Sequence, residues 1–186
     1  MPFELIHFRD SEKIIRKKKL DRDVKVTLNY ISDVLTGTIY RGELLRQALD
    51  EMGWRENGSL SILENRRYAY KGFKKGIALE GSFSSYEYLW AGLLRLQYGF
   101  DKKLIDTGIL MLTAARSEKS SLGNSKDLAV AEIEQLYPTI SLPVAIALFD
   151  LGAPVISDGE EEGGDANGVS VPTDQEKEAE KAVQRA

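Results

Sequence analysis

The chain has 186 residues, of which 42% are hydrophobic and 29% are charged, and its formal net charge is −4 at pH 7. This length suits a single domain with a substantial core, because domains typically run to about 100–150 residues. The chain contains no cysteine and one histidine, His7, which excludes disulfide scaffolds, thiolate zinc sites and multi-histidine metal centres. Carboxylates, lysines and hydroxyls remain for catalysis, and the hard cation Mg²⁺ is the natural cofactor for that set.

The charge is divided unevenly along the chain. Residues 151–186 hold nine acidic and three basic side chains, so the preceding body has 22 basic and 20 acidic residues and a net charge of +2. The run SDGEEEGGDANG has no aromatic residue and cannot bury enough apolar surface to offset its ordering entropy. We therefore expect a folded domain over 1–152 and an acidic, disordered tail over 153–186, interpreted as a solubilising end in preference to a regulatory arm.

No segment predicts a membrane span or a leader. The longest mostly apolar run, 142–156, is interrupted by Asp150 and is shorter than the ~18–20 residues that a span needs. The first ten residues, MPFELIHFRD, lack the basic start, apolar stretch and small-residue cleavage site of a signal peptide. We therefore expect a cytoplasmic protein without a membrane partner.

The first part of the chain predicts a strand followed by two helices. Residues 3–7 are typical of a short strand. Residues 11–35 carry apolar side chains at helical spacing, although 24–30 also fit the alternation of a strand. Residues 40–52 repeat apolar side chains at three- and four-residue intervals, and Gly53 supplies a stop.

The next part predicts strands that alternate with helices. Residues 60–62, 67–73 and 76–80 fit strands, and a helix is expected over 86–97 with Ser84 or Ser85 as its cap. The nearly continuous apolar runs at 106–113 and 143–149 are typical of strands buried on both faces, and 125–136 between them predicts a helix. This order predicts an α/β fold with a mixed central β-sheet flanked by helices.

Glu80 is the strongest candidate for chemistry. It follows the apolar run 77–79, and a carboxylate in a buried strand is costly unless it meets a cation or a hydrogen-bonding network. Glu43 begins a predicted helix that can approach the same end of the sheet, and Lys71 lies on the preceding strand. Two carboxylates beside a lysine can hold Mg²⁺ and orient water against a phosphodiester. The alternative is a strand-end glutamate paired with a lysine and nothing more.

Basic side chains gather in two places. Six of them in one predicted helix would form a positive surface that contacts DNA phosphates without reading sequence, and they are Lys13, Arg16, Lys17, Lys18, Lys19 and Arg22. The alternative is a solvated helix face. The polar loop 115–126 can reach a groove or simply connect two elements, and it adds Arg116, Lys119, Asn124 and Lys126.

Residues 75–113, KGIALEGSFSSYEYLWAGLLRLQYGFDKKLIDTGILMLT, place a strand ending in glutamate before a helix and a further apolar strand. Together with FELIH, the segment 11–31 and the Gly-Trp ending of 40–54, this order resembles the BglII/BstYI-type type II restriction endonucleases of the PD-(D/E)xK nuclease superfamily. The resemblance spans about 3–149 of the printed sequence. It implies a restriction-endonuclease-like fold, a homodimer that clamps double-stranded DNA, and cleavage with Mg²⁺.

Carried over residue by residue, the resemblance gives a degenerate catalytic motif. The family's catalytic glutamate corresponds to Glu80, and its last catalytic position, a Lys, Glu or Gln, corresponds to Ser82, whose hydroxyl is a poor base and a poor Mg²⁺ ligand. The metal-binding aspartate corresponds to Lys71, and a helix residue that is usually aspartate corresponds to Gly92. One expectation is a rearranged site of Glu80, Lys71, Ser82 and Glu43, with Glu80 and Glu43 as metal ligands. The plainer reading is loss of cleavage.

Three functions therefore stay open at the level of sequence. The first is a Mg²⁺-dependent duplex DNA endonuclease that uses the rearranged site. The second is a catalytically inactive homologue that binds DNA or protein as a subunit of a defence or repair complex. The third is a module of unrelated class. A nucleotide-hydrolysing motor is disfavoured, because the chain lacks the Gly-x-x-x-x-Gly-Lys-Ser/Thr phosphate loop.

Overall fold

The computed structural model describes residues 3–55, 61–63, 68–83, 88–114 and 125–152. All of them belong to one unit, residues 1–155. The acidic tail and the loop residues Arg116, Lys119 and Asn124 lie outside the described residues, so what the sequence predicts for them stays a prediction.

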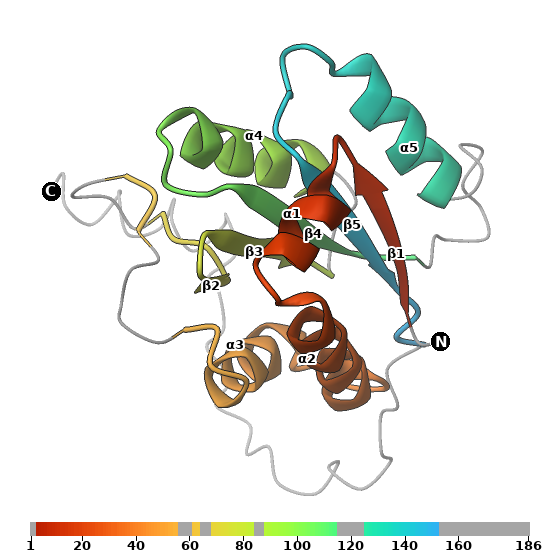
Figure 1. Ribbon diagram of the computed structural model, residues 1–186. Coiled ribbons are helices and arrows are strands. Elements are labelled where there is room, and N and C mark those ends of the chain that lie inside the picture. The colour runs from red at the N-terminus through yellow and green to blue at the C-terminus, as the bar shows by residue number, and fades with distance from the viewer. Residues whose placement is uncertain (1–2, 56–60, 64–67, 84–87, 115–124, 153–186) are drawn as a thin grey trace, which may run out of the picture. The chain divides into compact units, whose positions relative to one another are not determined.

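Within the described residues, five strands form one mixed sheet in the order β1-β5-β4-β3-β2 (Figure 1). These strands are β1 (Phe3–Phe8), β2 (Gly72–Lys74), β3 (Ile77–Ser82), β4 (Thr107–Thr113) and β5 (Val144–Phe149). The three central strands run parallel, whereas β1 pairs antiparallel with β5 and β2 pairs antiparallel with β3. Parallel strands covered on both faces read as continuous apolar runs, which is why β4 and β5 were recognisable in the sequence.

Helices cover both faces of the sheet (Figure 1). The described helices are α1 (Ser11–Lys17), α2 (Asp21–Leu35), α3 (Arg41–Glu51), α4 (Tyr88–Asp101) and α5 (Ser125–Gln135). Leu79 and Ile109 pack with buried residues of α1, α2 and α3, whereas Ala78 and Leu110 pack with those of α4 and α5. This alternation divides the core into two layers and confirms the predicted α/β fold.

The prediction of one helix over 11–35 was wrong. The chain breaks between α1 and α2, where Lys19 adopts a left-handed φ of 59°. The Lys19 amide donates to the Arg16 carbonyl and the Leu20 amide to the Ile15 carbonyl, which closes α1 in the manner of a Schellman motif. Ile15 and Leu20 are both buried, so their packing offsets the strain of a lysine where glycine is usual.

The expected strand over 67–73 is also shorter than predicted. Among the described residues of this stretch, regular pairing is confined to β2, and an isolated bridge joins Ser61 to Ala69. At the start of β2, an added Cβ on Gly72 would lie 3.1 Å from the Cβ of buried Trp54, so the close approach favours glycine. Among the described helices, none combines the length and the apolar character that crossing a membrane would require.

Candidate functional site

Glu80 lies inside β3 and its side chain is wholly buried. The strand continues to Ser82, so Glu80 is not its last residue. Glu80 is two residues from Ala78, so the two side chains point to the same face of the sheet, and Ala78 packs in the layer covered by α4 and α5. The following residue is glycine because an added Cβ on Gly81 would lie 2.5 Å from the Met111 carbonyl oxygen on β4. The sequence thus forces a carboxylate into an apolar layer, where it needs partners.

The partners of Glu80 come from α4. The Tyr88 hydroxyl donates a hydrogen bond of 2.6 Å to Glu80 Oε2. Arg95 Nη1 donates to the Tyr88 oxygen at 2.6 Å and lies 3.6 Å from Glu80 Oε2. Tyr88 and Arg95 are seven residues apart, which places them on the same face of a helix two turns apart. We call these three residues the Glu80 cluster.

Burial and charge act in opposite directions on the Glu80 cluster. Burial raises the pKa of Glu80, while the Tyr88 hydrogen bond, the Arg95 guanidinium and the Lys71 ammonium lower it. Burial, followed by the adjacent Glu80 carboxylate, raises the pKa of Tyr88 well above its usual range. Burial and the Glu80 carboxylate also raise the pKa of Tyr70, to about 12. Both phenols therefore stay protonated near neutral pH, and Tyr88 remains a hydrogen-bond donor.

The structure does not bring Glu43 and Glu80 together. Glu43 is exposed on α3, whose buried residues pack on the opposite face of the sheet from the Glu80 cluster. It lines a separate hollow with Arg46, Asp50 and other residues of its own helix. The geometry therefore gives no support to a metal site built from the two glutamates.

The side chains around Glu80 do not fit a Mg²⁺ ion. Such ions are held by one or two carboxylates together with water and substrate phosphates. Here Glu80 Oε2 is engaged by Tyr88 and Arg95, although Oε1 has no hydrogen-bond partner among the described residues. Within that same part of the chain, no three carboxylate or imidazole groups gather where they could hold a metal ion. The cationic groups of Arg95 and Lys71 lower the pKa of Glu80 and so favour its charged form.

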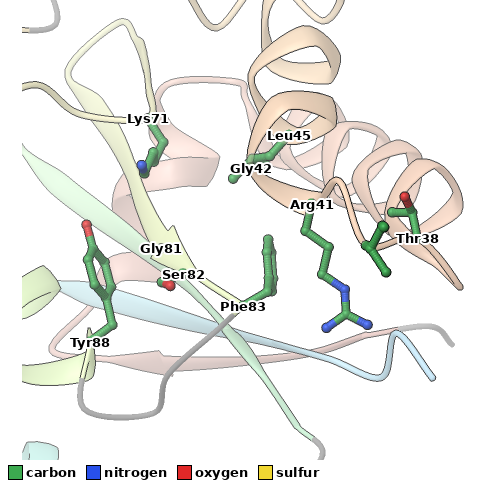
Figure 2. Close-up of a pocket in the computed structure, with 10 residues that line it drawn as sticks. Thr38, Arg41, Gly42, Leu45, Lys71, Gly81, Ser82, Phe83 and Tyr88 are labelled. Carbon is green, nitrogen blue, oxygen red and sulfur yellow. The ribbon is translucent and has the colours of Figure 1, made fainter. Parts of the chain in front are cut away.

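A hollow of about 440 Å³ lies beside the Glu80 cluster (Figure 2). One side is formed by the start of α3 and the residues before it, and the other by the end of β3, Lys71 and Tyr88. Its lining residues are Thr38, Ile39, Arg41, Gly42, Leu45, Lys71, Gly81, Ser82, Phe83 and Tyr88. We call it the α3–β3 pocket. It brings together Lys71 and Ser82 from the predicted site, and it adds Arg41, which the sequence gave no reason to select.

Half of the basic segment 13–22 is neutralised by neighbouring carboxylates. The ion pairs are Lys13 with Asp10, Arg16 with Glu12, and Lys18 with Asp106. Lys17, Lys19 and Arg22 are exposed, and no ion pair joins them to a carboxylate of the described residues. In the second basic group, Lys126 pairs with Glu4 of β1. The surface available to an anionic partner is therefore narrower than the sequence suggests.

Sequence reasoning missed Tyr88, Arg95 and Arg41. The first two carried a weak signal, since two polar side chains spaced by seven residues lie on one face of a helix and can share a buried partner. Arg41 carried no such signal, because its place in the pocket depends on how α3 packs against the sheet.

No protein-family model and no curated protein matches this chain. Among solved structures, the chain is similar to restriction endonuclease BglII in a crystal structure with a DNA 16-mer. The TM-score is 0.57 at 13% sequence identity, and the match covers 80% of this chain and 76% of the endonuclease chain. This similarity, together with the mixed sheet and its flanking helices, shows that the chain has a restriction-endonuclease-like fold.

Proposed function

We propose that this protein binds double-stranded DNA through a restriction-endonuclease-like fold and does not cut it. The observation that carries the proposal is the Glu80 cluster, in which a tyrosine and an arginine engage the carboxylate that the resemblance assigns to a metal. DNA as the ligand is supported by the similar structure, which was determined with a DNA 16-mer. It is also supported by the net positive charge of the body that precedes the acidic tail.

The rearranged catalytic site receives little support from the geometry. A metal-dependent nuclease needs carboxylates that converge on the reacting phosphate, and Glu43 lies over the other face of the sheet. Lys71 stands where the resemblance expects a metal-binding aspartate, and it adds positive charge where a cation would have to bind. The protein is better suited to hold DNA, alone or for a partner subunit, than to hydrolyse it.

The proposed contacts with DNA phosphates are Lys17 at the end of α1, Lys19 after it and Arg22 in the first turn of α2, none of which forms an ion pair with a carboxylate of the described residues. Replacing Lys17, Lys19 and Arg22 together with glutamine should reduce the magnitude of the log–log salt slope of duplex binding by about 2–3, since each phosphate contact contributes about 0.9. Fluorescence anisotropy with a labelled duplex over a series of salt concentrations measures this slope. Mg²⁺ and Mn²⁺ should leave the duplex intact.

A matched control removes the same amount of positive charge from cations that already have partners. Lys13, Arg16 and Lys25 each pair with a carboxylate one turn away. Replacing these three with glutamine should change the salt slope by less than one. Equal effects of the two triple variants would reject a specific contact surface. Metal-dependent cutting by the wild-type protein would reject the proposed loss of cleavage.

We further propose that the protein is a homodimer that uses the outer face of α4. Trp90 and Leu94 are one turn apart on this helix and are 56% and 65% exposed. Large apolar side chains that stay exposed together often mark an interface. Replacing Leu94 with lysine should convert a dimer into a monomer in sedimentation equilibrium, whereas lysine at the exposed Val26 of α2 should not. A wild-type protein that is monomeric at micromolar concentration would contradict this proposal.

A further inference from the structure

The α3–β3 pocket carries positive charge that its own lining does not neutralise. Arg41 and Lys71 line it, and no acidic side chain is among the described residues that form its lining. The Lys71 ammonium forms no ion pair with a carboxylate of the described residues, although Glu80 influences it from the next strand. A concave surface with one sign of charge concentrates ligands of the opposite sign.

Arg41 is anchored through one nitrogen of its guanidinium to an acceptor in the described part of the chain. Its Nη2 donates to the Gly152 carbonyl at 3.0 Å, which anchors the guanidinium. Its Nε is buried and has no hydrogen-bond partner in the part of the chain that the structure describes. A guanidinium presents five donors in a fixed fork that matches the oxygens of a phosphate.

The N-terminus of α3 adds to the attraction of the pocket for an anionic ligand. Arg41 and Gly42 are the first two residues of this helix, and backbone amides in a first turn have no acceptor within the helix. An added Cβ on Gly42 would meet nothing within 4 Å, so the approach to these amides is open. The helix terminus therefore supports the two cations and is not by itself the site.

In Figure 2 Phe83 lies between Arg41 and Lys71, and all three residues line the pocket. The pocket volume of about 440 Å³ falls within the range of about 300–1,000 Å³ that is typical of small-ligand sites. Apolar lining from Ile39, Leu45 and Phe83 suits the sugar or base that accompanies a phosphate.

We infer that the α3–β3 pocket binds a nucleotide phosphate ester without a metal, with Arg41 and Lys71 as the charged contacts. The phosphate ester belongs either to a DNA strand that crosses the pocket or to a free nucleotide. In the first case the inference deepens the proposed function and rests on it. In the second case it stands independently. In both cases the pocket includes Lys71 and Ser82, two of the positions that the resemblance assigns to the catalytic motif.

The test is isothermal titration calorimetry of the full chain with thymidine 5′-monophosphate in the presence of a chelator, alongside duplex binding by anisotropy. Replacing Arg41 with glutamine or Lys71 with methionine should weaken binding of the mononucleotide by about tenfold or more each, because hydrogen bonds to charged groups contribute about 1.5–3 kcal/mol. Gly42→Asp, which places a carboxylate at the open approach, should have a similar effect.

Two control variants carry the same changes outside the pocket. Arg46→Gln lies on α3 and Lys75→Met lies in the turn after β2, and neither residue lines the pocket. Both should bind the mononucleotide as the wild-type protein does. Circular dichroism should show that all five variants are folded.

The outcomes separate this inference from the proposed function. If the pocket variants weaken both ligands and the mononucleotide competes with the duplex, the ester belongs to a DNA strand. If they weaken the mononucleotide alone, the pocket serves a free nucleotide. Mononucleotide binding without any duplex binding would overturn the proposed function and leave the inference standing. If the wild-type protein binds no mononucleotide and the pocket variants bind duplex normally, the inference is overturned.

Discussion

Replacing Gly92 with aspartate should lower the free energy of unfolding by about 3 kcal/mol or more, because it overpacks a core and buries an unpaired carboxyl group. Gly92 is buried on the face of α4 that packs against β4. An added Cβ would lie 2.5 Å from Leu110 Cδ1, and Leu110 is itself fully buried, so either its side chain must repack or α4 must shift. Urea unfolding followed by tryptophan fluorescence measures the change.

The control for this variant is Gly42→Asp. Gly42 is exposed in the first turn of α3, where an added Cβ meets nothing and a negative charge is favoured by the helix dipole. We expect its unfolding free energy to stay within about 0.5 kcal/mol of the wild-type value, as for most surface substitutions. A Gly92→Asp protein within about 1 kcal/mol of the wild type would show that α4 can move away from the sheet at little cost.

Gly92 is also a position at which this chain differs from the pattern that the resemblance implies. The resemblance expects aspartate there, whereas an added Cβ at this position would lie 2.5 Å from Leu110 Cδ1 of β4, so a side chain fits only if Leu110 or α4 shifts. The same close approach brings Tyr88 and Arg95 onto Glu80. The glycine at position 92 and the enclosure of Glu80 are therefore two features of the same packing of α4 on the sheet.

The fold was largely predictable because its strands carry strong local patterns. The apolar runs that became β4 and β5 can be satisfied only by burial on both faces, and this required helices on either side of a sheet. The break at Lys19 could not be predicted, because it depends on packing in the core and not on a local pattern. A left-handed lysine is unfavourable locally, and it is retained because Ile15 and Leu20 pack in the core, which no local pattern reveals.

The candidate site was only partly predictable. The cost of burying a carboxylate led to Glu80 and correctly required a partner for it. The partners Tyr88 and Arg95 come from a helix in the crossover between parallel strands, so their contact with Glu80 depends on the position of that helix. Glu43 was placed near the same sheet end by its position in the sequence, which does not determine the face of the sheet that α3 covers.

Removing Arg95 should destabilise the protein in a manner that depends on pH. The pKa of Glu80 is raised in the folded state, so its contribution to stability is complete below the ordinary value of 4.5 and is lost as the pH rises through the folded-state pKa. The Arg95 guanidinium lowers the pKa of Glu80 and so opposes the increase that burial causes. Arg95→Met should therefore cost more at pH 8 than at pH 5, because removing Arg95 raises the folded-state pKa of Glu80 further and widens the pH range over which its ionisation favours unfolding.

A double-mutant cycle isolates the interaction between the two side chains. Glu80→Gln keeps an acceptor for the Tyr88 hydroxyl and cannot ionise, so Arg95→Met should cost the same at both pH values in that background. We expect a coupling free energy of about 1–2 kcal/mol at pH 8, below the usual range for buried ion pairs because Arg95 is 31% exposed. Unfolding in urea at pH 5 and pH 8 for the four proteins supplies the cycle. A coupling that is zero, or equal at the two pH values, would mean that Tyr88 alone stabilises the buried carboxylate, and the charge of Arg95 would then have no part in its stabilisation.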